Sequence, residues 1–261
     1  MILPVRTWGH GHHTVLLVHG LMADHRTWRR IGPELAARGH RVIAVDLRGH
    51  GAAPAATGRQ GHRPEELAQD LVDTLPRGAD LALGHSLGAL ALLLAADRLA
   101  PARAVYSDPA WVDLPRDLPA LRAAKHASRA DLRVLHPRWT QADLDDELDA
   151  LAKWDPRSAD ALLACPGLPP APGRASLVQL ADPSRRIGSA DAALLRARGY
   201  TVRVVPGAGH TIHRDDPEGF TASLEGWILP KPASPAKPAP ARTAPAKRTP
   251  AQTTPARSDE T

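Results

Sequence analysis

A serine, a histidine and two aspartates in this sequence have the residue types that acyl transfer requires. A serine hydroxyl is a poor nucleophile until a base accepts its proton, and an imidazole, with an ordinary pKa of about 6.5, is a suitable base at neutral pH. A buried carboxylate fixes the imidazole tautomer and stabilises its protonated form. The candidates are Ser86 as nucleophile, His210 as base, and Asp182 or Asp108 as acid.

The segment around Ser86 predicts a strand, a sharp turn and a helix. The apolar run 79–83 comes before it, and residues 87–96 are rich in good helix formers and contain no helix breaker. The pattern G-x-S-x-G over residues 84–88 is typical, in this context, of a nucleophile elbow. Its glycines let the backbone pass close to its neighbours, and the serine hydroxyl projects over the end of the sheet.

Both candidate acids follow a predicted strand and precede a proline. The chain order Ser86, Asp182, His210 is the order found in hydrolases with this elbow, and it favours Asp182 as the acid. Asp108 also follows the serine, so chain order leaves it open as the alternative. The glycines before His210 allow a loop to carry the imidazole across the strand ends.

A tetrahedral intermediate also needs amide donors for its oxyanion. The backbone N–H of Leu87, directly after the serine, is one expected donor. The second is expected from the turn after the strand 14–18, at the N–H of Leu21. His19 and Gly20 would shape that turn.

No cofactor and no metal site are expected. Residues 10–13 contain three histidines, but no acidic residue or cysteine stands beside them at ligand spacing. This segment therefore predicts a solvated turn.

Alternating strands and helices predict a parallel sheet that brings the candidate residues together. The carboxyl ends of parallel strands lie at one edge, so the loops after them meet there. Strands are expected over 14–18, 41–47, 79–83, 102–106, 176–181 and 200–205, and helices over 33–38, 64–75, 87–99, 190–198 and 219–229.

The alternation stops between residues 111 and 173, where no strand is predicted. Helical segments are expected instead around 118–129, 141–154 and 159–164, separated by prolines. A helical lid is the expected structure. It would divide the core into a first part, 1–110, and a second part, 174–229.

Residues 230–261 are rich in Pro, Ala, Lys, Arg and Thr, which predicts a disordered tail. Six basic and two acidic side chains lie after Pro230, so this tail carries +4 of the net charge of +5. The rest of the chain is close to neutral, and no nucleic-acid partner is expected.

Composition favours a cytoplasmic protein with one large core. The chain has 261 residues, 43% of them hydrophobic, and its single cysteine, Cys165, excludes an intramolecular disulfide. The first residues lack the features of a secretory signal. No apolar run approaches the roughly 18 residues of a membrane span.

Five motifs together resemble the α/β-hydrolase superfamily, near its esterases, cofactor-free haloperoxidases and C–C hydrolases. They are His19-Gly20, Asp46-Leu47-Arg48-Gly49-His50-Gly51, Gly84-His85-Ser86-Leu87-Gly88, Asp182 and Gly209-His210. The resemblance spans 14–229 and implies an α/β fold, with a mostly parallel central sheet flanked by helices and a helical lid inserted after the fourth clear strand. A serine at the elbow disfavours haloalkane dehalogenase and epoxide hydrolase relatives, which have aspartate there.

The expected function is that of a serine hydrolase that cleaves a small-molecule carboxylic ester or related acyl compound through an acyl-enzyme. A C–C bond hydrolase, a lactonase or a cofactor-free perhydrolase could use the same residues. A non-catalytic ligand receptor of this fold is the alternative from another class.

Overall fold

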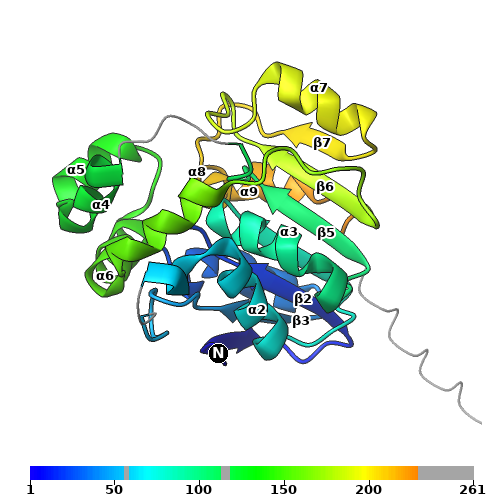
Figure 1. Cartoon of the computed structure of the whole chain (residues 1–261), viewed down its shortest axis with the longest axis horizontal. Helices are drawn as coiled ribbons and strands as arrows, with labels where there is room; N and C mark the ends of the chain where they lie inside the picture. The colour runs from blue at the N-terminus through cyan, green and yellow to red at the C-terminus, as the bar shows by residue number, and fades with distance from the viewer. Residues whose placement is uncertain (56–58, 113–117, 229–261) are drawn as a thin grey trace, which may run out of the picture. The chain divides into compact units, whose positions relative to one another are not determined.

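A seven-stranded sheet forms the centre of the protein (Figure 1). Its spatial order is β1-β3-β2-β4-β5-β6-β7, and all pairs are parallel except that of β1 with β3. The strands are β1 (Val5–Trp8), β2 (His13–Val18), β3 (His40–Val45), β4 (Leu81–His85), β5 (Arg103–Ser107), β6 (Ala175–Leu180) and β7 (Thr201–Val204). The predicted mostly parallel α/β fold is confirmed.

This computed structural model describes residues 1–55, 59–112 and 118–228. The predicted basic tail, 230–261, lies outside the described residues. Contacts group Met1–Lys231 into one unit, which contains every described residue. None of the helices in the described part of the chain has the length and apolar character needed to cross a bilayer.

Two hydrophobic layers cover the two faces of the sheet, because side chains alternate along each strand. Leu16 and Val18 of β2 belong to the layer under α2, α3 and α7, whereas Val15 and Leu17 belong to the layer under α1 and α9. The helices outside the lid region are α1 (Ile31–Ala37), α2 (Pro64–Thr74), α3 (Leu87–Leu99), α7 (Ser189–Ala197), α8 (Ile212–Asp215) and α9 (Pro217–Ser223).

The register of the sheet aligns the carboxyl ends of β2, β4 and β5. Gly84 of β4 pairs with Val18 of β2 on one side and with Tyr106 of β5 on the other. One residue further, His85 pairs with Ser107. The residues that follow β4 and β5 are therefore neighbours.

Between β5 and β6 the described residues form helices and contain no strand. They are α4 (Leu118–Ala123), α5 (Arg129–Leu135) and α6 (Gln141–Lys153), with 3-10 helices over Ala124–His126 and Pro156–Ala164 (green in Figure 1). These helices and the described loops between them are called the cap below. Its division from the core at 111 and 173 stays a prediction.

Two predicted helices differ from the structure. The helix expected over 118–129 is broken, because Ser128 begins α5 with a reciprocal capping box to Asp131. The helix expected over 219–229 begins earlier, at Pro217 behind the N-cap Asp216, and ends at Ser223. Capping side chains set both boundaries.

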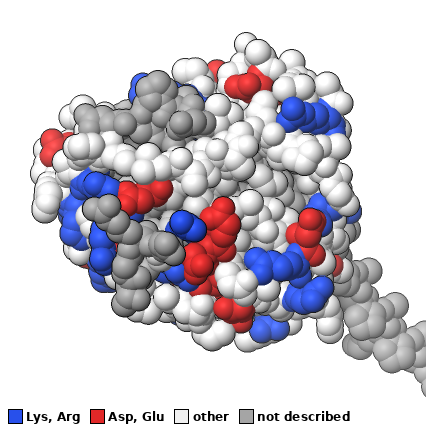
Figure 2. All heavy atoms as spheres, viewed as in Figure 1, with Lys and Arg blue, Asp and Glu red and all other residues white. Residues whose placement is uncertain are grey.

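Ion pairs connect α6 of the cap to the core. Acidic side chains of α6 face arginines from the segment after β2, and acidic and basic side chains lie near one another on the face shown in Figure 2. Of the ion pairs between α6 and the core, the most buried joins Arg214 of α8 to Glu147 of α6 at 2.5 Å, with the two side chains 2% and 11% exposed. The Arg214 guanidinium also lies 4.6 Å from the centre of the Trp139 ring.

Replacing Arg214 with methionine is expected to destabilise the protein, because Glu147 would remain buried without its counter-charge. Breaking one partner of a buried pair costs about 3 kcal/mol or more in the free energy of unfolding. Urea unfolding checks this, with Arg38→Met as control, since the Arg38–Glu34 pair is exposed. The double variant Arg214→Met/Glu147→Leu should recover much of the loss. Equal effects of Arg214→Met and Arg38→Met would contradict the expectation.

Candidate active site

Ser86 occupies a strained turn between β4 and α3, as the elbow motif predicts. Its φ of 49° is a left-handed value that a non-glycine residue rarely adopts. A Cβ at Gly84 would lie 2.6 Å from the carbonyl oxygen of Gly88, and one at Gly88 would lie 2.3 Å from that of His19. Glycine is therefore required at both positions.

His210 lies between the serine and a buried carboxylate. Its Nε2 is 3.0 Å from Ser86 Oγ, and its Nδ1 is 2.5 Å from Asp108 Oδ2. Asp108 follows β5 and is completely buried. Burial alone would raise the pKa of Asp108, but hydrogen bonds from His210 and Ser184 outweigh it and hold that pKa below its ordinary value.

The favoured acid, Asp182, does not contact His210 in the structure, and the alternative, Asp108, does. Asp182 is exposed, and its Oδ2 accepts a hydrogen bond from Gly207 N at 3.1 Å. The physical reason is strand order, since β5 lies directly beside the elbow strand β4, whereas β6 lies one strand further away. Chain order favoured Asp182 and did not exclude Asp108, because it carries no information on which strands are neighbours.

The two expected oxyanion donors lie on either side of the elbow. Leu87 is the first residue of α3, where a backbone N–H has no partner within its own helix. The turn before Leu21 is close to the elbow, because a Cβ at Gly20 would lie 3.2 Å from Ser86 Cβ. Within the described ranges, neither N–H donates a hydrogen bond. Their role as an oxyanion hole stays a prediction.

His19 holds the turn that contains Leu21. Its Nδ1–H donates to the carbonyl oxygen of Gly20 at 2.7 Å, and its Nε2 accepts from Leu47 N at 3.0 Å. Burial lowers the pKa of His19 and keeps the ring neutral, as these two bonds require. The imidazole thus ties the end of β2 to the end of β3.

His85, the residue before the nucleophile, holds the main chain of the His210 loop. Its Nε2–H donates to the carbonyl oxygen of His210 at 2.9 Å, and the two rings are 4.7 Å apart. Burial lowers the pKa of His85 to about 3, so the ring is neutral. The sequence placed His85 in the motif but indicated no role for it.

A cavity of about 530 Å³ borders Asp108 and His210. Residues 135–138 of the cap line one side, and the loops after β6 and β7 line the other. The cap and the core thus both contribute to the surroundings of the imidazole.

Comparisons with known proteins agree with this architecture. The model of the Alpha/beta hydrolase family matches residues 15–223. A probable esterase, PIR7A, of Oryza sativa subsp. indica is 39% identical over 92 residues, 34% of each chain. Epoxide hydrolase B of Mycobacterium tuberculosis is 38% identical over 78 residues, 29% of this chain and 22% of that protein. The enol-lactonase of Burkholderia xenovorans LB400 has a TM-score of 0.69 and 23% identity, over 87% of this chain and 96% of its own.

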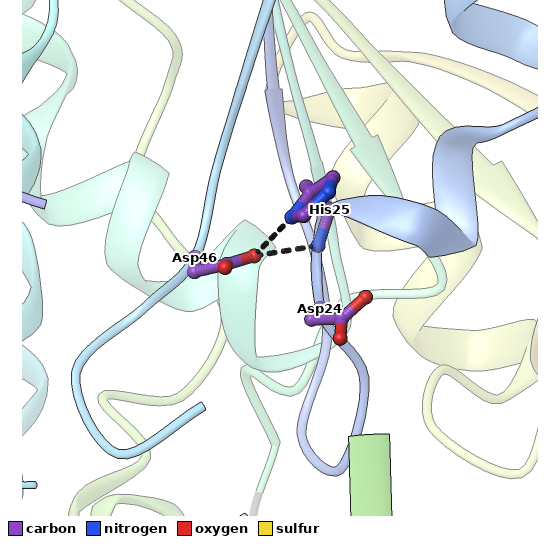
Figure 3. Close-up of side chains that lie close together, drawn as sticks. All are labelled: Asp24, His25 and Asp46. Carbon is purple, nitrogen blue, oxygen red and sulfur yellow. Dashed lines mark hydrogen bonds and ion pairs between the residues drawn. The ribbon is translucent and has the colours of Figure 1, made fainter. Parts of the chain in front are cut away.

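A second group of ionisable side chains follows β2 and β3, where the sequence predicted no metal site. Asp24, His25 and Asp46 each place one possible ligand atom within 4.8 Å of the others (Figure 3). These atoms already have partners. Asp46 Oδ1 accepts from the backbone N and the Nδ1 of His25, both at 2.8 Å, and Asp24 accepts from Arg26 through both oxygens. A metal ion would have to break these bonds. We therefore interpret the hydrogen bonds of these three side chains as contacts that stabilise the segment after β2.

The His25–Asp46 pair predicts a pH-dependent contribution to stability. The hydrogen bond to Asp46 raises the pKa of His25, so the stabilisation is complete below the ordinary histidine pKa and is lost as pH rises through the raised value. The pKa of Asp46 is lowered, because hydrogen bonds from His25 and from Ala52 N outweigh its burial, so its own contribution is lost only as pH falls below the ordinary aspartate range.

His25→Asn is expected to remove this pH dependence while it keeps a donor near the position of Nδ1. Between about pH 6 and about pH 8, the stability advantage of the wild type over the variant should shrink by about 1 kcal/mol. Urea unfolding across this range provides the measurement. The exposed His12→Asn is the control, and a constant advantage across the range would refute the assignment.

Proposed function

Because the chain belongs to the alpha/beta hydrolase family, we propose that it is a serine hydrolase that cleaves a carboxylic ester or a related acyl compound. One observation carries the proposal, namely that the His210 imidazole lies within hydrogen-bonding distance of both Ser86 Oγ and the Asp108 carboxylate. The chain spans about a third of the length of its rice relative, which is named a probable esterase. The serine at the elbow differs from the aspartate nucleophile expected of an epoxide hydrolase.

The acyl-enzyme forms in a first half-reaction. Asp108 accepts the Nδ1–H of His210, which leaves Nε2 free to take the proton of Ser86. The serine oxygen attacks the carbonyl carbon, and the N–H groups of Leu21 and Leu87 hold the negative oxygen. The imidazolium then gives its proton to the leaving alcohol, and the carbon–oxygen bond breaks.

A water molecule completes the reaction. His210 takes a proton from the water, and the hydroxide attacks the acyl carbon. The proton returns to Ser86 Oγ as the ester to the serine breaks and the carboxylic acid leaves. Asp108 stabilises the imidazolium in both halves, so a buried, ionised carboxylate is required throughout.

Ser86→Ala is expected to lower kcat for p-nitrophenyl acetate on the order of a million-fold, because the nucleophile is lost. Steady-state kinetics measure the loss, and a fluorophosphonate probe should label the wild type at Ser86 but not the variant. The control is Ser176→Ala, a buried serine at the start of β6 that should keep its activity. Activity retained within about tenfold in Ser86→Ala would refute the nucleophile. Failure of the wild type to label would favour the non-catalytic receptor.

Asp108→Asn is expected to lower kcat about ten-thousandfold, by analogy with other triads, because an amide at this position favours the wrong imidazole tautomer. Asp182→Asn is the matched control, with the same change on a carboxylate that does not contact His210, and it should stay within about threefold. Kinetics on the same ester compare the two variants. A larger loss of kcat in Asp182→Asn than in Asp108→Asn would identify Asp182 as the acid.

A further inference from the structure

The two oxygens of the Asp108 carboxylate have different partners. Oδ2 contacts His210 Nδ1, whereas Oδ1 accepts from Ser184 Oγ at 2.6 Å and more distantly from Ala181 N at 3.3 Å. Because Asp108 is fully buried, these groups stand in place of water. The short bond from Ser184 is thus the main contact on the side of the carboxylate away from His210.

The Ser184 hydroxyl is itself fixed in direction. Its oxygen accepts from the backbone N of Arg186 at 3.1 Å and of Ile187 at 3.0 Å. These two donors occupy the acceptor positions of the hydroxyl, so its proton is directed to Asp108. The hydrogen bonds from the backbone of the same loop therefore orient the Ser184 hydroxyl as a donor to Asp108.

We propose that Ser184 is a positioning residue that aims the Asp108 carboxylate at His210. This inference rests on the proposed function, in which Asp108 is the acid of the triad. A carboxylate held at one oxygen alone can rotate about its own axis, whereas donors on both oxygens fix its plane. Hydrogen bonds to an ionised group are also roughly twice as strong as neutral ones.

The position of Ser184 explains what the loop after β6 does in this chain. Chain order led us to expect the acid in this loop, at Asp182. The acid comes instead from the end of β5, and the loop after β6 provides the hydroxyl that holds it. The two strands pair directly, and Asp108 N donates to Gln179 O at 2.8 Å, which sets the distance between acid and donor.

Other charged and titratable groups surround the Asp108–His210 pair and are the same in wild type and variant. They are His85 at the end of the elbow strand β4, Asp182, Arg185 and Arg186 after β6, His213 and Asp215 of α8, and His136 and Arg138 of the cap. A change in pH profile caused by Ser184 alone can therefore be attributed to its hydroxyl.

The experiment compares Ser184→Ala with Ser184→Thr, which keeps the hydroxyl. Ser184→Ala is expected to lower kcat for p-nitrophenyl acetate about tenfold and to leave KM within about twofold, because Ser184 acts through Asp108. The pH at which activity is half lost on the acid side should rise by about 0.5, since a carboxylate without this donor holds the imidazolium proton more tightly. Ser184→Thr should restore kcat to within about threefold of the wild type and should bring the pH of half-lost activity back to the wild-type value.

A double-mutant cycle separates positioning from a merely structural role. In an Asp108→Asn background, Ser184→Ala should change kcat by less than about twofold, because the group that it positions is gone. Urea unfolding of each variant shows whether the turn after β6 remains folded.

The outcomes distinguish the two proposals. If Asp108→Asn retains activity, the proposed acid is wrong, and the role of Ser184 falls with it. If Asp108→Asn is inactive while Ser184→Ala keeps the wild-type kcat and pH profile, only the positioning role is overturned. An equal loss from Ser184→Ala with and without the Asp108 carboxylate also overturns it.

Discussion

The close approach of the elbow to the end of β2 is the constraint on which the rest of the site depends. At Gly88 a Cβ would meet the carbonyl oxygens of Val18 and His19 at 2.5 and 2.3 Å, so α3 can begin there only with glycine. This approach brings Ser86 beside the turn that carries Leu21. It also fixes the first turn of α3, in which Ala89 N and Leu90 N donate to the carbonyl oxygen of Ser86 at 3.1 and 3.2 Å. Strain at one residue is thus compensated by the packing of two buried strands and a helix.

Burial determines what the histidines around the site can do. His19, His85 and His213 are almost completely buried, and burial lowers the pKa of each, so they are neutral rings with fixed hydrogen bonds. The side chain of His210 is 39% exposed and has a carboxylate at its Nδ1. Of these four, His210 is therefore the imidazole suited to exchange protons during a reaction. His19 and His85 instead hold backbone segments around it, and His213 Nε2 lies 2.7 Å from the Thr27 hydroxyl.

Hydrophobic patterning and turn chemistry were sufficient to predict the sheet, the elbow and the loop of His210. Apolar runs mark β2 to β6 because these strands are buried on both faces. The carboxylate that contacts His210 could not be predicted, because Asp108 and Asp182 both follow strands and differ in which strand lies beside β4. That difference is a property of sheet order, which a linear pattern does not contain. The contacts of Asp24, His25 and Asp46 were missed for a similar reason, since they join loops after two different strands.

The position of the Asp108 carboxylate directly after β5 has a structural consequence for the loop after β6. A carboxylate next to the elbow strand is buried under its neighbours, so each of its oxygens needs a donor in place of water. His210 can serve only one of them. The other oxygen accepts from Ser184 Oγ and Ala181 N, both in the segment that follows β6, the strand paired with β5. The loop after β6 thus stabilises a buried carboxylate that belongs to the neighbouring strand end, through the hydroxyl of Ser184.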